Sequence, residues 1–340
     1  MSLDLFAPVV PKARQHPIFQ LLMRDEYGPE RATLASWAEG FLDRDGKFVQ
    51  ELQLTFESSF WELYLHAVLG ELRLTLDMSF DAPDFVVVQP HAFSIEATIA
   101  GPAQGGPPAF GYDARQDIPE DFTDFNIQAA IRICNAFDAK VRRYRNRYAA
   151  LPQAQGKPYV IAIGAFDRPY AHFAASRSVL AALYGLYFDE AATPRDATDV
   201  VRYNVGAAPK TPTADVPVGL FCDDSCADVS AVIYSPLATW GKLRALADNP
   251  GAHTIYQTFH PGDDGLLPKI LTRFKHEYQE HLVDGLYVLH NPFARHPLPP
   301  GALSHQRLSE VSMDSSGDLT FQAPDDFLLV RTLRSVVVRP

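Results

Sequence analysis

One apolar run, Lys157-Pro-Tyr-Val-Ile-Ala-Ile-Gly-Ala165, most restricts how this chain can fold. Its β-branched and aromatic residues favour a strand, and a strand with no polar face must be covered on both sides. A long helical pattern from Asp124 to Tyr148 precedes it, with apolar residues every three or four positions. A helix that leads into a buried strand is typical of a sheet with helices packed against it. We therefore expect an α/β protein.

The residues before this strand add three strands and another helix. Phe56 to Gly70 has the apolar spacing of an amphipathic helix, and residues 72–76, 83–88 and 92–98 have the composition or alternation of strands. The order within residues 51–166 is therefore helix, three strands, helix and strand. A meander of strands followed by a helical crossover predicts a mixed β-sheet core flanked by helices.

The rest of the chain is expected to elaborate this core. Residues 1–50 mix helical and loop signals, and residues 167–340 are expected to form an α/β extension that packs on the core. Within that extension, residues 171–188 have a helical pattern. Residues 189–227 are rich in Pro, Thr, Ala and Asp, which predicts a long loop or an insertion. Strand-like runs follow at residues 229–234, 253–259, 285–289 and 319–321.

Composition narrows the class of protein. Of the 340 residues, 47% are hydrophobic and 21% are charged, which excludes a disordered chain. No run approaches the roughly 20 apolar residues that span a bilayer, and three cysteines are too few for a disulfide framework. We expect a cytoplasmic protein with no membrane partner. The net charge of −11 argues against broad, charge-driven binding of nucleic acid.

Three carboxylates occupy positions where chemistry is expected. Asp84 opens one predicted strand, Glu96 lies among apolar neighbours in the next, and Glu62 lies on the helix before both. A short turn between the strands can bring Asp84 and Glu96 side by side, where they repel each other unless a cation or a proton intervenes. Mg2+ takes one or two carboxylates, a carbonyl and waters, and it activates water toward a phosphate. The structural alternatives are a turn cap at Asp84, an arginine partner for Glu96 and a solvated Glu62.

These residues resemble the motif of the PD-(D/E)xK phosphodiesterase superfamily, which has the restriction-endonuclease-like fold. The order of predicted elements also agrees with the core of that family, and the resemblance covers about a third of the chain. It implies that Asp84, Glu96 and the Ala97 carbonyl hold Mg2+ or Mn2+, with Glu62 assisting through water or a second ion. The matching residues are Glu62, Pro83-Asp84 and Glu96-Ala97-Thr98.

One residue departs from the family motif. The lysine of the family falls at position 98, where this chain has Thr98, which can form a hydrogen bond but carries no charge. Some members of the superfamily carry the lysine on the following helix instead, and Lys140 is the candidate there. The structural alternatives are a Thr98 that serves only the strand and a Lys140 that is an ordinary surface residue. A Lys140 that does not reach the carboxylates would leave the site inactive.

The same helix carries a dense run of basic residues. Their contacts with phosphates would each contribute modestly and would weaken with salt. The side chains of the run point in different directions around the helix, so only some of them can face one ligand. The alternative to phosphate binding is that the run is a solvated face, which pairs with the acidic residues 113–124. The candidate nucleic-acid contacts are Arg142, Arg143, Tyr144, Arg145 and Arg147.

The expected function is that of a metal-dependent phosphodiesterase, a nuclease that hydrolyses nucleic acid, with DNA as the expected substrate. Lys140 would neutralise charge that develops on the phosphate during attack by water. The alternative from another class is a catalytically inactive nuclease-fold protein that binds nucleic acid or protein, and a third is a hydrolase of a different phosphate ester. The resemblance also allows a homodimer, because enzymes of this type that cut both strands often dimerise.

Overall fold

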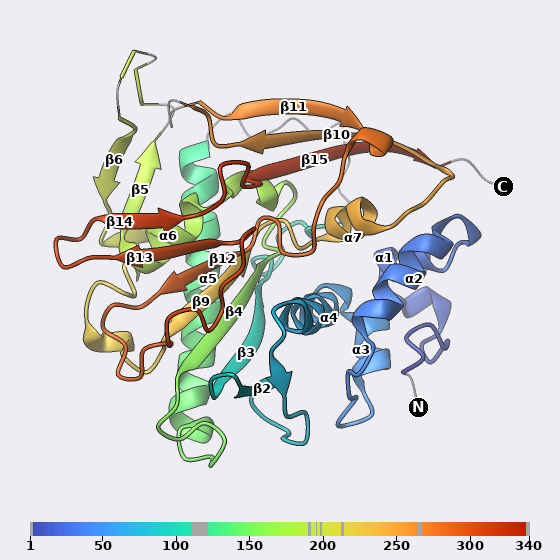
Figure 1. The fold of residues 1–340 in the computed structure, drawn as a ribbon, viewed down its shortest axis with the longest axis horizontal. Helices are drawn as coiled ribbons and strands as arrows, with labels where there is room; N and C mark the ends of the chain where they lie inside the picture. Colours follow the sequence, from blue (N-terminus) through green and yellow to red (C-terminus); the bar gives the residue numbers. More distant parts are fainter. Residues whose placement is uncertain are drawn as a thin grey trace.

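A mixed eight-stranded sheet forms the centre of the structure, a computed structural model that describes residues 3–110, 122–189, 192–194, 196–197, 199–211, 214–263 and 267–337 (Figure 1). Its strands lie in the order β1 (Thr75–Leu76), β2 (Phe85–Gln89), β3 (Phe93–Ala100), β4 (Tyr159–Ala165), β9 (Ala231–Ser235), β12 (Tyr287–His290), β13 (Ser309–Met313) and β14 (Leu319–Gln322). The pairs β3–β4, β4–β9 and β12–β13 are parallel, and the other neighbours are antiparallel. The expected mixed α/β class is confirmed.

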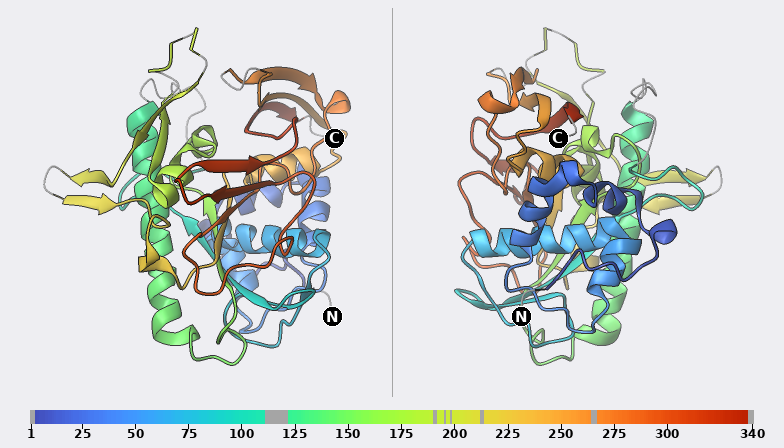
Figure 2. Two further views of the ribbon diagram at one scale, coloured as in Figure 1. Left: turned by 60° about the vertical axis from the view of Figure 1, so that its left-hand side comes forward. Right: turned by 90° about the vertical axis from the view of Figure 1, so that its right-hand side faces the viewer.

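Helices cover both faces of this sheet (Figure 2). They are α1 (Pro17–Leu22), α2 (Gly28–Trp37), α3 (Phe48–Leu54), α4 (Phe56–Glu71), α5 (Phe122–Arg143), α6 (Arg177–Tyr184) and α7 (Trp240–Leu246). The first four pack on one face, and α5 and α6 pack on the other. None of the helices in the described ranges is long and apolar enough to cross a membrane.

Alternating side chains of the central strands build one core on each face of the sheet. Ile95 of β3 and Val160 of β4 pack with α4, whereas Tyr159 and Ile161 of β4 pack with α5. β4 is buried along its whole length, which its uncharged sequence predicts. Because α5 is the crossover between the parallel strands β3 and β4, one face of both strands lies directly under it.

The remaining strands form smaller sheets. β10 (Ala252–His260), β11 (Lys269–Phe274) and β15 (Val330–Val337) form an antiparallel sheet with β10 in the middle, close to α7 (Figure 1). Two hairpins join β5 (Leu186–Asp189) to β6 (Val201–Asn204) and β7 (Ala207–Thr211) to β8 (Ala214–Pro217).

The predicted order of elements within residues 51–166 is present as α4, β1, β2, β3, α5 and β4. One expectation for the later part of the chain is wrong. Residues 171–188 are not one helix, because Gly185 ends α6 with a φ of 62°, a conformation that favours glycine, and β5 begins directly afterwards. Of the two alternatives for residues 189–227, the long loop does not hold, because this segment contains β6, β7 and β8.

A buried cluster of charges connects α7 with the three-stranded sheet. Glu280 lies 2.5 Å from the Lys242 ammonium, contacts the Arg331 guanidinium and accepts a hydrogen bond from the Tyr278 hydroxyl. Burial alone would raise the pKa of Glu280, but Arg331 and Lys242 outweigh burial and lower it. The carboxylate is therefore ionised and is shared by two buried cations.

Replacing this carboxylate should destabilise the fold strongly. Glu280→Ala leaves Lys242 and Arg331 buried without a counter-charge, and we expect the free energy of unfolding to fall by about 3–5 kcal/mol. Chemical denaturation at neutral pH measures the change. Glu39→Ala, which removes an exposed carboxylate, is the control and should change stability by less than about 0.5 kcal/mol. Equal losses in both variants would contradict a structural role for the buried cluster.

The same carboxylate predicts a dependence on pH. Its pKa is lower in the folded chain than its ordinary value of 4.5, so the unfolded chain binds more protons in acid. The stability that Glu280 contributes is therefore present above about pH 4.5 and is lost as the pH falls further. The gap in unfolding free energy between the unsubstituted chain and Glu280→Gln should narrow from about pH 6 to about pH 3. A gap that stays constant would show that Glu280 titrates alike in both states.

Candidate functional site

Glu96 occupies the middle of β3 and is only 1% exposed. Because its neighbours along the strand pack on the α4 side, Glu96 points to the opposite face, toward α5. Lys140 Nζ lies 2.8 Å and the Arg143 guanidinium 3.1 Å from its Oε1 atom, and the Tyr148 hydroxyl donates to the same oxygen at 3.3 Å. A buried carboxylate is costly without such partners. The structure thus brings the predicted Glu96, Lys140 and Arg143 together.

Asp84 lies beside Glu96 at the start of β2. The first residue of β2, Phe85, pairs with Ile95 in antiparallel register, which places the preceding Asp84 opposite Glu96. Asp84 Oδ2 accepts a hydrogen bond from the backbone N–H of Ala97 at 2.7 Å. The N–H and C=O of one strand residue point to the same side, so the Ala97 carbonyl also points toward Asp84.

The carboxyl groups at this site act on one another. Burial raises the pKa of Glu62 to about 8, and the Asp84 carboxylate adds to this effect while Arg44 opposes it. Burial also raises the pKa of Asp84 to about 6, with Glu96 adding to the shift and Lys140 opposing it. The three predicted carboxylates therefore influence one another, and burial contributes most to the shifts of Glu62 and Asp84.

One oxygen of Glu96 is left without a partner. Its Oε2 atom is buried and makes no hydrogen bond with the described part of the chain. An unpaired buried carboxylate oxygen is rare, and a water or an ion is its usual partner. Glu96 Oε2, the Asp84 carboxylate and the Ala97 carbonyl are the kind of oxygen donors that Mg2+ takes. These residues therefore fit a divalent cation.

Side chains alone would not complete the shell of such an ion. Within the described ranges, no three His, Cys, Asp or Glu side chains are grouped so that they could hold a metal. Mg2+ is commonly bound by one or two carboxylates and keeps several waters. The set therefore suits a hydrated ion, and Asp84 is the carboxylate whose charge acts on Glu62 most strongly after burial.

The other predicted residues of α5 and β3 have different surroundings. Arg145 pairs with Asp228 at 2.7 Å, and Arg142 and Arg147 are exposed. Thr98 is half-buried on the same face of β3 as Glu96, two residues further along. Only Lys140 and Arg143 of the basic run contact the carboxylate.

Tyr144 lies inside the protein. Its ring is 6% exposed and stacks on Tyr159 with a centroid distance of 4.2 Å. The acidic segment proposed as an alternative partner of the basic run spans residues 113–124, and its residues 113–121 lie outside the described residues.

Sequence reasoning did not assign two residues of the site. Arg44 influences both Glu62 and Asp84, and its guanidinium donates to the carbonyl oxygens of Phe80 and Pro83. It comes from the segment before α3, and no local pattern distinguishes it. Tyr148 ends the basic run, and only its contact with Glu96 reveals a role.

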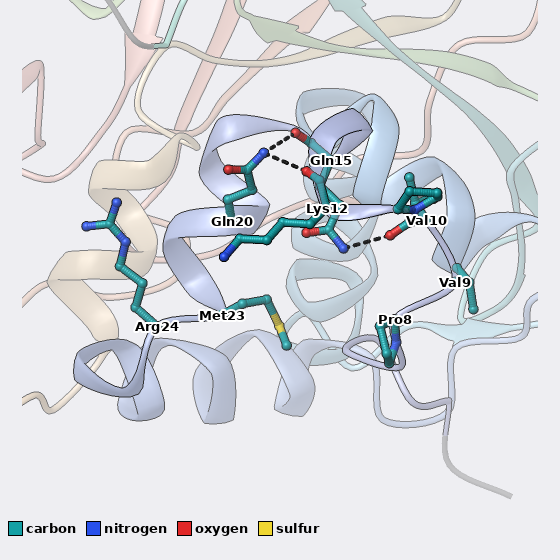
Figure 3. A pocket seen from close by; sticks show the side chains of 9 residues that line it. Pro8, Val9, Val10, Lys12, Gln15, Gln20, Met23 and Arg24 are labelled. Carbon is teal, nitrogen blue, oxygen red and sulfur yellow. Dashed lines mark hydrogen bonds between the residues drawn. The ribbon is translucent and has the colours of Figure 1, made fainter.

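A surface cleft of about 790 Å³ lies apart from these carboxylates (Figure 3). Nine residues between positions 8 and 24 line it, among them Lys12, Gln20 and Arg24. None of its lining residues belongs to the site around Glu96. The cleft is therefore separate from the carboxylate site.

Comparisons of the chain with known protein families, with curated proteins and with solved structures found no match. Its function must therefore be inferred from the site itself, which combines the buried Glu96, the half-buried Asp84, a backbone carbonyl and a lysine.

Without metal, Glu62→Gln should stabilise the chain at high pH. Between about pH 4.5 and about pH 8 the folded chain holds a proton on Glu62 that the unfolded chain has lost, so the unsubstituted chain loses stability as the pH rises. Glutamine cannot ionise. The unfolding free energy of the variant, measured with EDTA present, should match that of the unsubstituted chain near about pH 5 and exceed it above about pH 8. A difference that does not vary with pH would contradict the shifted pKa.

Proposed function

We propose that the chain is a metal-dependent phosphodiesterase, a nuclease that hydrolyses nucleic acid. The observation that carries this proposal is the 2.8 Å contact between Lys140 Nζ and Glu96 Oε1, beside Asp84. The resemblance to the PD-(D/E)xK superfamily left a positive charge missing at Thr98. Lys140 of α5 supplies a positive charge next to Glu96 instead.

The surrounding fold supports the same assignment. β1, β2 and β3 form an antiparallel meander, α5 crosses over, and β4 pairs in parallel with β3. Together with the preceding α4, these elements follow the order that the resemblance implies for a restriction-endonuclease-like core. The strands beyond β4 then extend the sheet rather than form the site.

The residues have separate roles in this proposal. Asp84, Glu96 and the Ala97 carbonyl would hold Mg2+ or Mn2+, which when bound supplies a Lewis acid for the phosphate and a more acidic water. Lys140 neutralises negative charge on the phosphate as water attacks. Glu62 holds a proton near neutral pH, so it can donate a hydrogen bond or, once ionised, orient a water.

Nucleic acid is the substrate class that the surroundings favour, with DNA as the expected form. The Arg143 side chain is 49% exposed, so it can contact a phosphate while it stays next to Glu96. Arg142 and Arg147 are exposed on the same stretch of chain. A few arginines beside the site would bind backbone phosphates in a salt-dependent way without a broadly basic surface.

One observation favours the alternative of an inactive nuclease-fold binding protein. Lys140 and Arg143 both contact Glu96, so two cations already balance the charge of this carboxylate. In that case the ion pair would replace the metal, and the fold would bind nucleic acid or protein without cutting it. Cleavage and metal dependence separate the two functions.

Cleavage assays on plasmid and single-stranded DNA with Mg2+ or Mn2+ test the proposal. We expect cleavage that EDTA abolishes and that falls at least about 100-fold in Asp84→Asn and Glu96→Gln, because each removes several kcal/mol of charge stabilisation. Lys140→Met should lower the rate about 100- to 1000-fold. Two matched substitutions of exposed residues, Glu39→Gln and Lys269→Met, should leave the rate unchanged.

Two results would contradict this function. Undiminished cleavage by Asp84→Asn or Glu96→Gln would mean that the activity belongs to another site or another protein. Retained binding of DNA, with no cleavage under any divalent ion, would favour the inactive binding protein.

A further inference from the structure

The end of α5 departs from α-helical geometry next to the site. Tyr144–Tyr148 forms a π-helical turn, and such turns inside α-helices occur frequently at functional sites. In a continued α-helix, about seven residues make two turns, so Arg147 would return to the face of Lys140. A π-helical turn contains one more residue than an α-helical turn, so Tyr148 takes the place on this face that Arg147 would have had. Tyr148 is buried, and Arg147 is exposed.

The turn is anchored by a second tyrosine. Tyr144 stacks on Tyr159 of β4 with an interplanar angle of 25°, which fixes the turn against the sheet. Tyr148 then places its hydroxyl 3.3 Å from Glu96 Oε1. An ionised carboxylate can only accept a hydrogen bond, so the Tyr148 hydroxyl is the donor.

The donors around Glu96 are distributed unequally between its two oxygens. Lys140, Arg143 and Tyr148 all converge on Oε1, and no donor from the described residues reaches Oε2. A carboxylate fixed through one oxygen cannot rotate freely, so the direction of its second oxygen is also fixed. Second-layer hydrogen bonds of this kind orient the ligands of metal sites.

Two more buried hydroxyls lie on this face of the sheet. Ser94 precedes Glu96 by two residues on β3 and pairs in register with Tyr159, and neither hydroxyl has a partner in the described ranges. Unpaired polar atoms at three neighbouring positions are unusual in a protein interior. They suit a hydrated ion, whose waters need donors and acceptors around them.

We propose that Tyr148 is a positioning residue for Glu96, and that the π-helical turn exists to bring its hydroxyl to Oε1 so that Oε2 is directed at a divalent cation. This inference rests on the metal site of the proposed function. Tyr148 itself touches neither the cation nor the phosphate. It acts through the carboxylate, so its loss should weaken metal binding before it affects anything else.

Titration of the full chain with Mn2+, without nucleic acid and followed by calorimetry or electron paramagnetic resonance, tests the inference. Tyr148→Phe keeps the ring and removes the hydroxyl, and we expect Mn2+ to bind 10- to 100-fold more weakly. The control is Tyr184→Phe, which removes a buried hydroxyl that donates to the His290 and Val311 carbonyls away from the site. Its affinity for Mn2+ should be unchanged. Thermal unfolding of both variants shows whether each remains folded.

The outcomes separate this inference from the proposed function. Equal Mn2+ affinity in Tyr148→Phe and the unsubstituted chain would overturn the positioning role, and so would an unsubstituted chain that does not bind Mn2+. Weaker Mn2+ binding in Tyr148→Phe, in a chain that cuts no nucleic acid, would support the positioning role while contradicting the nuclease.

Discussion

A carboxylate buried in the middle of a strand is the constraint on which this structure depends. Glu96 lies on β3, and its charge can be tolerated there only because α5 carries Lys140 and Arg143 across the same face of the sheet. Leaving such a charge unpaired typically costs about 3–5 kcal/mol. Parallel strands such as β3 and β4 need a crossover, and here the crossover helix α5 also brings two cations back over the strand that it left. The same element thus completes the core and the site.

The balance of charge around Glu96 explains how an acidic protein could act on a polyanion. Glu62 and Asp84 both have raised pKa values because burial and mutual repulsion disfavour their charged forms. A divalent cation would relieve this repulsion and at the same time attract a phosphate. The net charge of −11 thus excludes a general nucleic-acid coat protein but is compatible with a local site that combines carboxylates, a metal and a few exposed arginines.

The sequence predicted the features that carry their own local pattern and missed those that depend on contacts between distant segments. β4 and α5 were recognisable from composition and spacing, and Glu96 was recognisable as a charge among apolar strand residues. Arg44 was not, because its position comes from the packing of the N-terminal segment. Neither was the role of Tyr148, because a π-helical turn has no local sequence signature. Short strands such as β13 were missed because their structure depends on pairing with β12 rather than on their own composition.

The most direct test of the account is a crystal structure of the chain soaked in Mn2+, with the anomalous signal recorded at the manganese edge. We expect one strong peak about 2.1–2.3 Å from both Glu96 Oε2 and an Asp84 oxygen, with the Ala97 carbonyl as a further ligand and Lys140 still close by. A site without a peak, in which the Lys140 ammonium bridges Glu96 and Asp84, would contradict it.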